Sequence, residues 1–179
     1  MPRHYPQTKD ELKSLVDDLS INLGDIETCL ITDMSSLFSI TKRTDFSGIE
    51  FWDTSNVTNM AGMFSRVEYF NENINAWNVS KVVDMMFMFE NALNFNQPLD
   101  KWDTSSVEYM EGMFEGAIHF NQNINSWNVS NVKDMSEMFK EANNFNQNLD
   151  SWNVNNSVCY DEMFVGSPLQ SNPPKWYKP

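Results

Sequence analysis

The chain has 179 residues, a formal net charge of −13 at pH 7 and 13% aromatic residues. This length suits one domain or two small ones with a substantial core, and the aromatic content argues against disorder. The strong negative charge and the lack of a basic run disfavour nucleic acid and anionic membrane surfaces as partners.

The N-terminal segment, residues 1–22, is expected to form a capping helix. Thr8 and Glu11 have the spacing of a capping box, which marks a helix start. The apolar residues that would share one face of this helix are Leu12, Leu15, Val16 and Leu19. The segment lacks the apolar stretch of a secretory signal, and the chain has no run of about 18 apolar residues. We therefore expect no membrane insertion and a cytoplasmic location for the chain as written, with removal of a leader left open.

A repeat of 25 residues fills the centre of the chain, residues 23–166. The tryptophans that mark it follow one another without insertion or deletion: Trp52, Trp77, Trp102, Trp127 and Trp152. A Met-Phe pair recurs in every unit, beginning at Met63, Met88, Met113, Met138 and Met163. A degenerate sixth unit, with Ile26 at the Trp position, precedes the others and is separated from them by one extra residue. A period this regular predicts a stack of similar coils.

Each unit is expected to hold one short strand and one short helix. Trp77 and Val79 have the two-residue period of a strand. The residues that would form the helical face of the same unit are Val82, Met85, Met88, Phe89 and Ala92. Ser105 with Glu108 forms a capping box at the start of such a helix. The sequence therefore predicts an α/β solenoid, leucine-rich-repeat-like, of about six coils.

The repeat also predicts which columns are structural. The Trp residues are expected to be core and not platforms for a ligand, and the Asn after each closing Phe is expected to form hydrogen bonds to turn backbone or along the stack. At a coil spacing of roughly 4.8 Å, Cys29 and Cys159 would lie at opposite ends of the molecule, too far apart for a disulfide.

A C-terminal cap is expected at residues 167–179, where the repeat stops. Trp176 is expected to fold back over the last open coil. The chain would then be a single domain in three parts: residues 1–22, 23–166 and 167–179.

The repeat unit, W-[DN]-[TV]-S-x-V-x-x-M-x-x-M-F-x-x-A-x-x-F-N-x-x-[IL], resembles that of the BspA-like leucine-rich-repeat surface proteins of bacteria. The segment WNVSNVKDMSEMFKEANNFNQNLD, residues 127–150, is similar to a typical unit of that family, and the resemblance covers nearly the whole chain. It implies a scaffold for protein contacts, often on the bacterial surface and often in adhesion to host proteins or other cells.

The sequence shows no arrangement typical of catalysis, of a cofactor or of a metal site. His4 and His119 have no second ligand at metal-binding spacing, and no phosphate loop, zinc motif or nucleophile motif occurs. Carboxylates beside each Trp alternate with Asn from coil to coil, which we interpret as a solvated ladder whose amides separate like charges. The alternative, a glycosidase-like acid pair such as Asp100 with Asp103 or a calcium ladder, has no unique location, because the same arrangement recurs in another unit.

The function that the sequence favours is a non-enzymatic protein-binding repeat scaffold of bacterial type, without a cofactor, as a monomer or weak homo-oligomer. The protein partner is not identified. A secreted or surface adhesin is the alternative, and a carbohydrate-active enzyme built on a solenoid is a weaker one. Contacts on the presumed concave face are expected at the variable column before Trp and at the acid after it: Phe51, Asp53, Lys101 and Asp103.

A second candidate surface lies in the second unit. Met86 and Phe87 stand where the other units carry small or polar residues, at a position expected to face solvent on the convex side. Gly62 and Gly112 occupy the equivalent position of Phe87 in the adjacent units. Two interpretations stay open: the ring packs over these glycines, or the pair forms a hot spot for a partner or a second copy.

Overall fold

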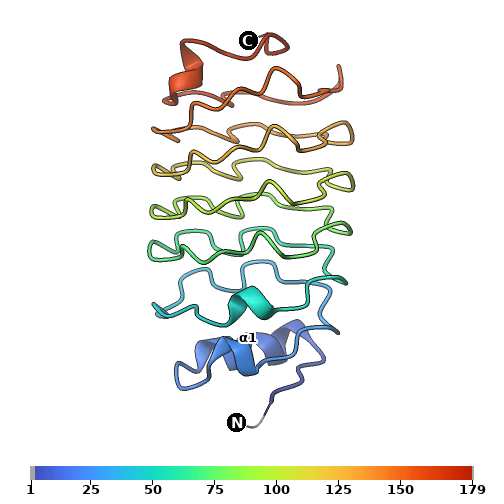
Figure 1. Cartoon of the computed structure of the whole chain (residues 1–179), viewed down its shortest axis with the longest axis vertical. Coiled ribbons are helices and arrows are strands. Elements are labelled where there is room, and N and C mark those ends of the chain that lie inside the picture. Colours follow the sequence, from blue (N-terminus) through green and yellow to red (C-terminus); the bar gives the residue numbers. More distant parts are fainter. Residues whose placement is uncertain (1–2, 179) are drawn as a thin grey trace.

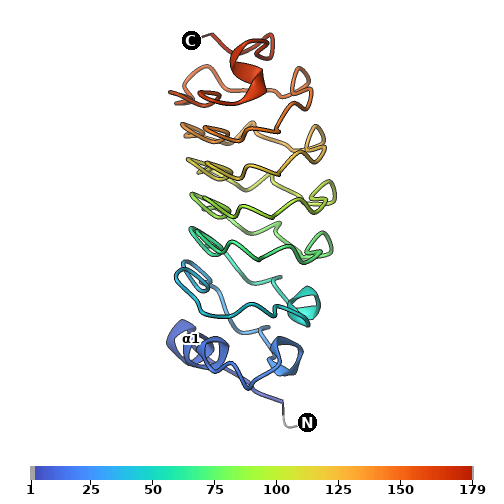
Figure 2. The same cartoon turned by 90° about the vertical axis from the view of Figure 1, so that its left-hand side faces the viewer.

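A computed structural model describes residues 3–178, in which the chain winds into flat coils stacked along one axis (Figures 1 and 2). The two termini lie at opposite ends of the stack, and the stack is nearly straight in both views. The helical elements are α1 (Lys9–Asp17) and three single 3-10 turns, η1 (Leu23–Asp25), η2 (Ile49–Phe51) and η3 (Pro168–Gln170). No helix in this part of the chain is long and apolar enough to cross a membrane.

The prediction of an α/β solenoid with a strand and a helix in every coil is wrong. Over residues 3–178, α1 is the one α-helix, and no strand extends beyond a single bridging residue. Successive repeat coils share isolated parallel bridges that lie seven residues after the Trp position, and one further bridge, between His4 and Ile26, joins the N-terminal segment to the first coil. The bridged residues of this column are Asp33, Asn59, Asp84, Tyr109, Asp134 and Cys159. A straight stack without a continuous sheet also lacks the concave strand face of a leucine-rich repeat.

The predicted helix is replaced by a run of β-turns. The N–H of Met63 donates to the carbonyl of Met60 (3.1 Å), which closes a turn whose third residue, Gly62, has a φ of 61°. The N–H of Met60 donates instead to the carbonyl of Asp84 in the next coil (2.9 Å). Arg66, four residues after Gly62, also has a positive φ. A right-handed helix cannot continue through such residues, and its N–H groups would have to bond four residues back.

The capping box predicted at Ser105 is also wrong. The N–H of Ser105 donates to Oδ1 of Asp103 (3.1 Å), which closes an Asx turn and not a helix N-terminus. Glu108 forms an ion pair with Lys133 of the next coil (2.6 Å). Ser105 and Glu108 thus fix a turn and a contact between coils.

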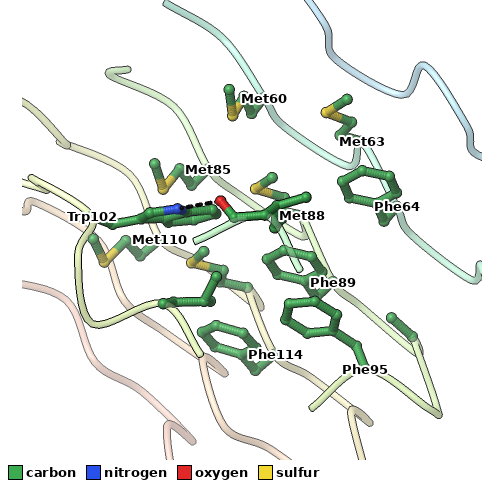
Figure 3. Packing of buried hydrophobic residues seen from close by; sticks show 14 of the residues in the cluster. Met60, Met63, Phe64, Met85, Met88, Phe89, Phe95, Trp102, Met110 and Phe114 are labelled. Atoms are coloured by element: carbon green, nitrogen blue, oxygen red, sulfur yellow. Dashed lines mark hydrogen bonds between the residues drawn. The ribbon is translucent and has the colours of Figure 1, made fainter. Parts of the chain in front are cut away.

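The repeated apolar residues form one continuous core along the stack. Each Trp from Trp52 to Trp152 is only 3–4% exposed. The indole N–H of Trp102 donates to the carbonyl of Ile74 in the preceding coil (3.1 Å; Figure 3). Phe89 stacks on Phe95 of its own coil at 4.1 Å and on Phe114 of the next coil at 5.5 Å between ring centroids. The prediction that the Trp column belongs to the core is confirmed.

An asparagine ladder from Asn71 to Asn146 supports the return segments of four successive coils. The N–H of Asn96 donates to Oδ1 of Asn71, and the N–H of Asn121 donates to Oδ1 of Asn96 (both 3.0 Å). Nε2 of Gln122 donates to the same Asn96 oxygen (3.0 Å). The predicted structural role of this column is therefore confirmed: the Asn side chains form hydrogen bonds along the stack, from coil to coil.

The helix α1 starts where the sequence indicates. Oγ1 of Thr8 accepts the N–H of Glu11 (3.2 Å), and Leu12 and Val16 are fully buried. Leu19 lies beyond the end of α1 and is 56% exposed, so its predicted place on the apolar face is wrong.

Trp176 extends the Trp column at the other end. Its indole N–H donates to the carbonyl of Leu149 (2.8 Å), and its ring lies 6.2 Å from that of Trp152. The prediction that it covers the last coil is confirmed. Both cysteines are free and exposed. Residues 1, 2 and 179 of the two predicted caps lie outside the described residues.

Candidate functional site

The first candidate surface lies on the Trp segments, by which we mean residues 50–53, 75–78, 100–103, 125–128 and 150–153. Phe51, in η2, is 79% exposed, and Asp53, Lys101 and Asp103 are exposed as well. Phe51 and Lys101 occupy the same position two coils apart, a separation of about 10 Å at the usual spacing of paired backbones. They share one side of the stack without forming a compact cluster.

Asp53 and Asp103 also have a structural role. Hydrogen bonds from the Ser55 side chain and backbone lower the pKa of Asp53, and Ser105 does the same for Asp103. In the coil between them, Asn78 accepts the N–H of Ser80 in the same way (3.1 Å). The turn therefore needs a side-chain oxygen, which either Asp or Asn supplies. What Asp53 and Asp103 add beyond the turn is negative charge on the surface.

The acid and amide residues two positions before Trp interact directly. Nδ2 of Asn75 donates to a carboxylate oxygen of Asp100 (2.8 Å), and Oδ1 of Asn75 accepts the N–H of Lys101 (3.1 Å). This geometry fits the interpretation of amides between like charges. Over residues 3–178, no group of three or more His, Cys, Asp or Glu side chains is placed to hold a metal ion.

The second candidate surface is the turn face, by which we mean the outward side of the paired β-turns at residues 34–41, 60–67, 85–92, 110–117 and 135–142. Phe87 lies here with a φ of 56° and is half-buried. Its ring lies directly against Gly112, so that a Cβ on that glycine would overlap the ring atoms. Of the two open interpretations, the structure shows the packing contact, on Gly112 and not on Gly62.

A shallow hollow of about 500 Å³ lies on the other side of Phe87. Small residues of the first two coils, among them Ser36, Ala61 and Gly62, line it. Met86 and Phe87 line it from the next coil. Small side chains in the first two coils are thus followed by the large side chains of Met86 and Phe87 in the next coil. The surface of the turn face is therefore higher at Met86 and Phe87 than beside them.

Two carboxylates in the coil beyond Phe87 lie among other acidic side chains. Burial, Asp134 and Glu137 raise the pKa of Glu111. Burial, Glu137 and Glu90 raise the pKa of Glu115, against a smaller lowering by Lys140 and Arg66. None of the ion pairs among residues 3–178 includes Glu111 or Glu115. The nearby acids Asp134, Glu137 and Glu90 outweigh the opposing cations, so this part of the turn face is acidic.

We expect the double substitution Glu111→Gln with Glu115→Gln to raise Tm at pH 7. A raised folded-state pKa means that the folded chain binds protons more tightly than the unfolded chain, so stability falls as pH rises above the unfolded value of about 4.3. The gain should therefore vanish below about pH 4, where both carboxyls are protonated in both states. Thermal unfolding followed by circular dichroism across this range measures it, and a gain that persists at pH 3 would contradict the electrostatic cause.

We expect Gly112→Ala to destabilise the chain through the ring of Phe87. The new Cβ would overlap the ring, and Gly112 has a φ of 55°, which itself costs about 1–2 kcal/mol for alanine. Combining it with Phe87→Ser should recover the steric part, giving a coupling of about 1 kcal/mol or more in a double-mutant cycle. Urea unfolding of the four proteins measures this coupling, and strict additivity would show that the ring does not rest on Gly112.

One exposed apolar residue was missed by the sequence interpretation. Ile40 is 91% exposed and has a φ of 56°, in the column where later coils carry Arg66, Asn91 and Gly116. The available signal was an isoleucine in a column that is otherwise polar or glycine: Ile40 follows Ile26 by 14 residues, as Arg66 follows Trp52.

The chain matches a family model described as "Mycoplasma protein of unknown function, DUF285", over residues 10–110 and again over residues 77–176. Together the two matches span most of the chain. No match was found among curated proteins or among solved structures.

Proposed function

Because this chain belongs to the DUF285 family, whose description names no activity, we propose its function from its own surface: it is a non-enzymatic protein-binding repeat scaffold. The observation that carries the proposal is the separation of two kinds of column. The Trp and Met-Phe columns are buried, whereas the column before Trp is exposed and changes from Phe51 to Ala76 to Lys101.

Such a surface suits recognition of a protein. The stacked coils fix the spacing of the exposed side chains at no further entropic cost, which is the advantage of a repeat scaffold. An exposed aromatic such as Phe51 can act as an anchor, and the neighbouring charges of Asp53, Lys101 and Asp103 can select the partner.

The test uses the whole chain as bait in extracts of its source cells, beside the double variant Phe51→Ser with Lys101→Ser. Tyr69→Ser is the matched control, because Tyr69 is also a large exposed aromatic (61%) but lies outside the Trp segments. A protein retained by the wild type and the control and lost by the double variant is then purified for calorimetry. Unchanged affinity of that partner for the double variant would contradict the proposed contact surface.

An adhesin is the second candidate, favoured by the resemblance of the repeat unit to BspA-like surface proteins. It requires the chain to lie outside the cell, whereas the scaffold function is equally compatible with the cytoplasm. Protease treatment of intact cells separates the two locations, because only a surface protein is degraded before lysis. A glycan-hydrolysis assay addresses the enzymatic alternative: turnover that Asp103→Asn abolishes would overturn the non-enzymatic proposal.

A further inference from the structure

Ile40 combines two unfavourable features. Its side chain is 91% exposed, and its φ of 56° is a conformation that β-branched residues rarely adopt. A strained and exposed apolar residue contributes little to folding, so its presence calls for a reason outside the fold.

The surroundings of Ile40 supply one. Ile40 and Leu19 line a hollow of about 350 Å³, and Leu19 is itself 56% exposed. Ser39 lines both this hollow and the hollow beside Met86 and Phe87. The apolar side chains at the two ends are therefore joined by a low surface of small residues.

Charge indicates what could occupy this surface. Asp84 and Glu90 line the hollow beside Phe87, and Glu111 and Glu115 lie in the following coil. The hollow at Ile40 is different: Lys13, which is paired with Asp17, and Lys42 line it, so the acidic charge is confined to the Phe87 end. Arg66 is engaged with Glu90 (3.2 Å). A second copy of the chain would bring another net charge of −13 against these carboxylates, and an anionic membrane would be repelled likewise.

We propose that the turn face from Ile40 to Phe87 is a docking surface for a cationic polypeptide segment that carries apolar side chains. The inference rests on the proposed protein-binding function but concerns a surface other than the Trp segments. Apolar side chains of the partner fill the two hollows, and its Lys or Arg side chains reach the carboxylates at the Phe87 end.

The probe is a fluorescein-labelled synthetic peptide with four lysines flanking a Leu-Phe pair, titrated with the full chain in a fluorescence anisotropy assay. Two reference peptides replace the Leu-Phe pair by Ser-Ser or the lysines by glutamates. We expect the first peptide to bind most tightly and the glutamate peptide not to bind. Affinity for the first peptide should fall as salt is raised, because exposed charges are screened.

Two substitutions test the apolar contacts without unfolding the chain. Ile40→Asn removes the apolar side chain and places a residue that accepts a positive φ, so Tm should rise while affinity falls. Phe87→Gly places the residue of the adjacent coils at the same position. Each should weaken binding of the Leu-Phe peptide by about five- to tenfold, the usual range for an interface anchor. Unchanged affinity for both variants would overturn the proposal.

The charges are tested by Glu111→Gln with Glu115→Gln, beside the matched pair Glu68→Gln with Glu72→Gln, which has the same spacing outside the turn face. Substituting Glu111 and Glu115 should weaken peptide binding and reduce the dependence of affinity on salt. Substituting Glu68 and Glu72 should change affinity by no more than about twofold, because salt screens distant charges. Equal losses from both pairs would show attraction by net charge alone and overturn the proposed site. Binding of the Leu-Phe peptide that is lost in Phe51→Ser with Lys101→Ser but unchanged in Ile40→Asn and Phe87→Gly would overturn this inference while leaving the proposed function intact.

Discussion

Replacing Trp102 by alanine is expected to lower the free energy of unfolding by about 3–5 kcal/mol, the usual cost of emptying a large core position. The ring is 3% exposed and lies 6.2 Å from that of Trp127 in the next coil. The change also removes the indole donor from the carbonyl of Ile74. Because coils contact only their neighbours, a gap in the middle coil breaks the stack into two short halves, which are less stable than the whole.

Two control variants separate the causes of this loss. Trp102→Phe keeps an aromatic ring and removes the N–H donor, so it should cost less than the alanine variant. Trp176→Ala removes the half-buried terminal ring of the column and should cost less than a central Trp. Urea unfolding followed by fluorescence gives all three values. Equal losses at Trp102 and Trp176 would contradict the neighbour-only description of the stack.

The period and the core could be predicted from the sequence, because both follow from burial. A side chain that recurs every 25 residues must meet its own equivalent in the next coil, whatever backbone conformation carries it. The Trp column, the Asn ladder and the closing role of Trp176 were therefore predictable. The local conformation was not, because apolar spacings of three and four residues turn Met60, Met63 and Phe64 inward equally well in a helix and in successive β-turns.

A signal against the helix was nevertheless present. Gly62 and Gly112 stand in the middle of the predicted helix, where glycine costs about 1 kcal/mol relative to alanine. Both have a positive φ, as do the residues at the same position in the other coils, including Phe87 and Glu137. Glycine at this position in two units therefore indicated a left-handed backbone conformation. The other units carry other residues there, such as Phe87 and Glu137, so the signal was easy to miss.

The candidate contacts were predictable only in part. Exposure of Phe51 and Lys101 followed from a column that varies between units. The hollow beside Phe87 did not, because it depends on which coils stack small residues against large ones in three dimensions. Ile40 was missed because the first unit is degenerate, with Ile26 in place of Trp, so the column of Arg66 was not extended back to it.

Gly48→Ala is expected to be the most damaging of the glycine substitutions in the described chain, at about 3 kcal/mol or more from strain and overlap combined. Gly48 precedes η2 with a φ of 93°, and a Cβ there would lie 2.7 Å from Cα of Gly24 and nearer still to its N. These are backbone atoms of the neighbouring coil, so no rotamer change can relieve the overlap, and the coils of η1 and η2 would have to separate.

Gly62→Ala is the matched control for this prediction. Gly62 has a φ of 61°, but the nearest atom to its Cβ would be Oγ of Ser36 at 3.3 Å, a side chain that can move. Backbone strain alone should then cost about 1–2 kcal/mol. Urea unfolding of both variants measures the difference. A cost at Gly48 no larger than at Gly62 would mean that the close approach of the first two coils is not a fixed feature of the stack, and that left-handed strain alone sets the need for glycine.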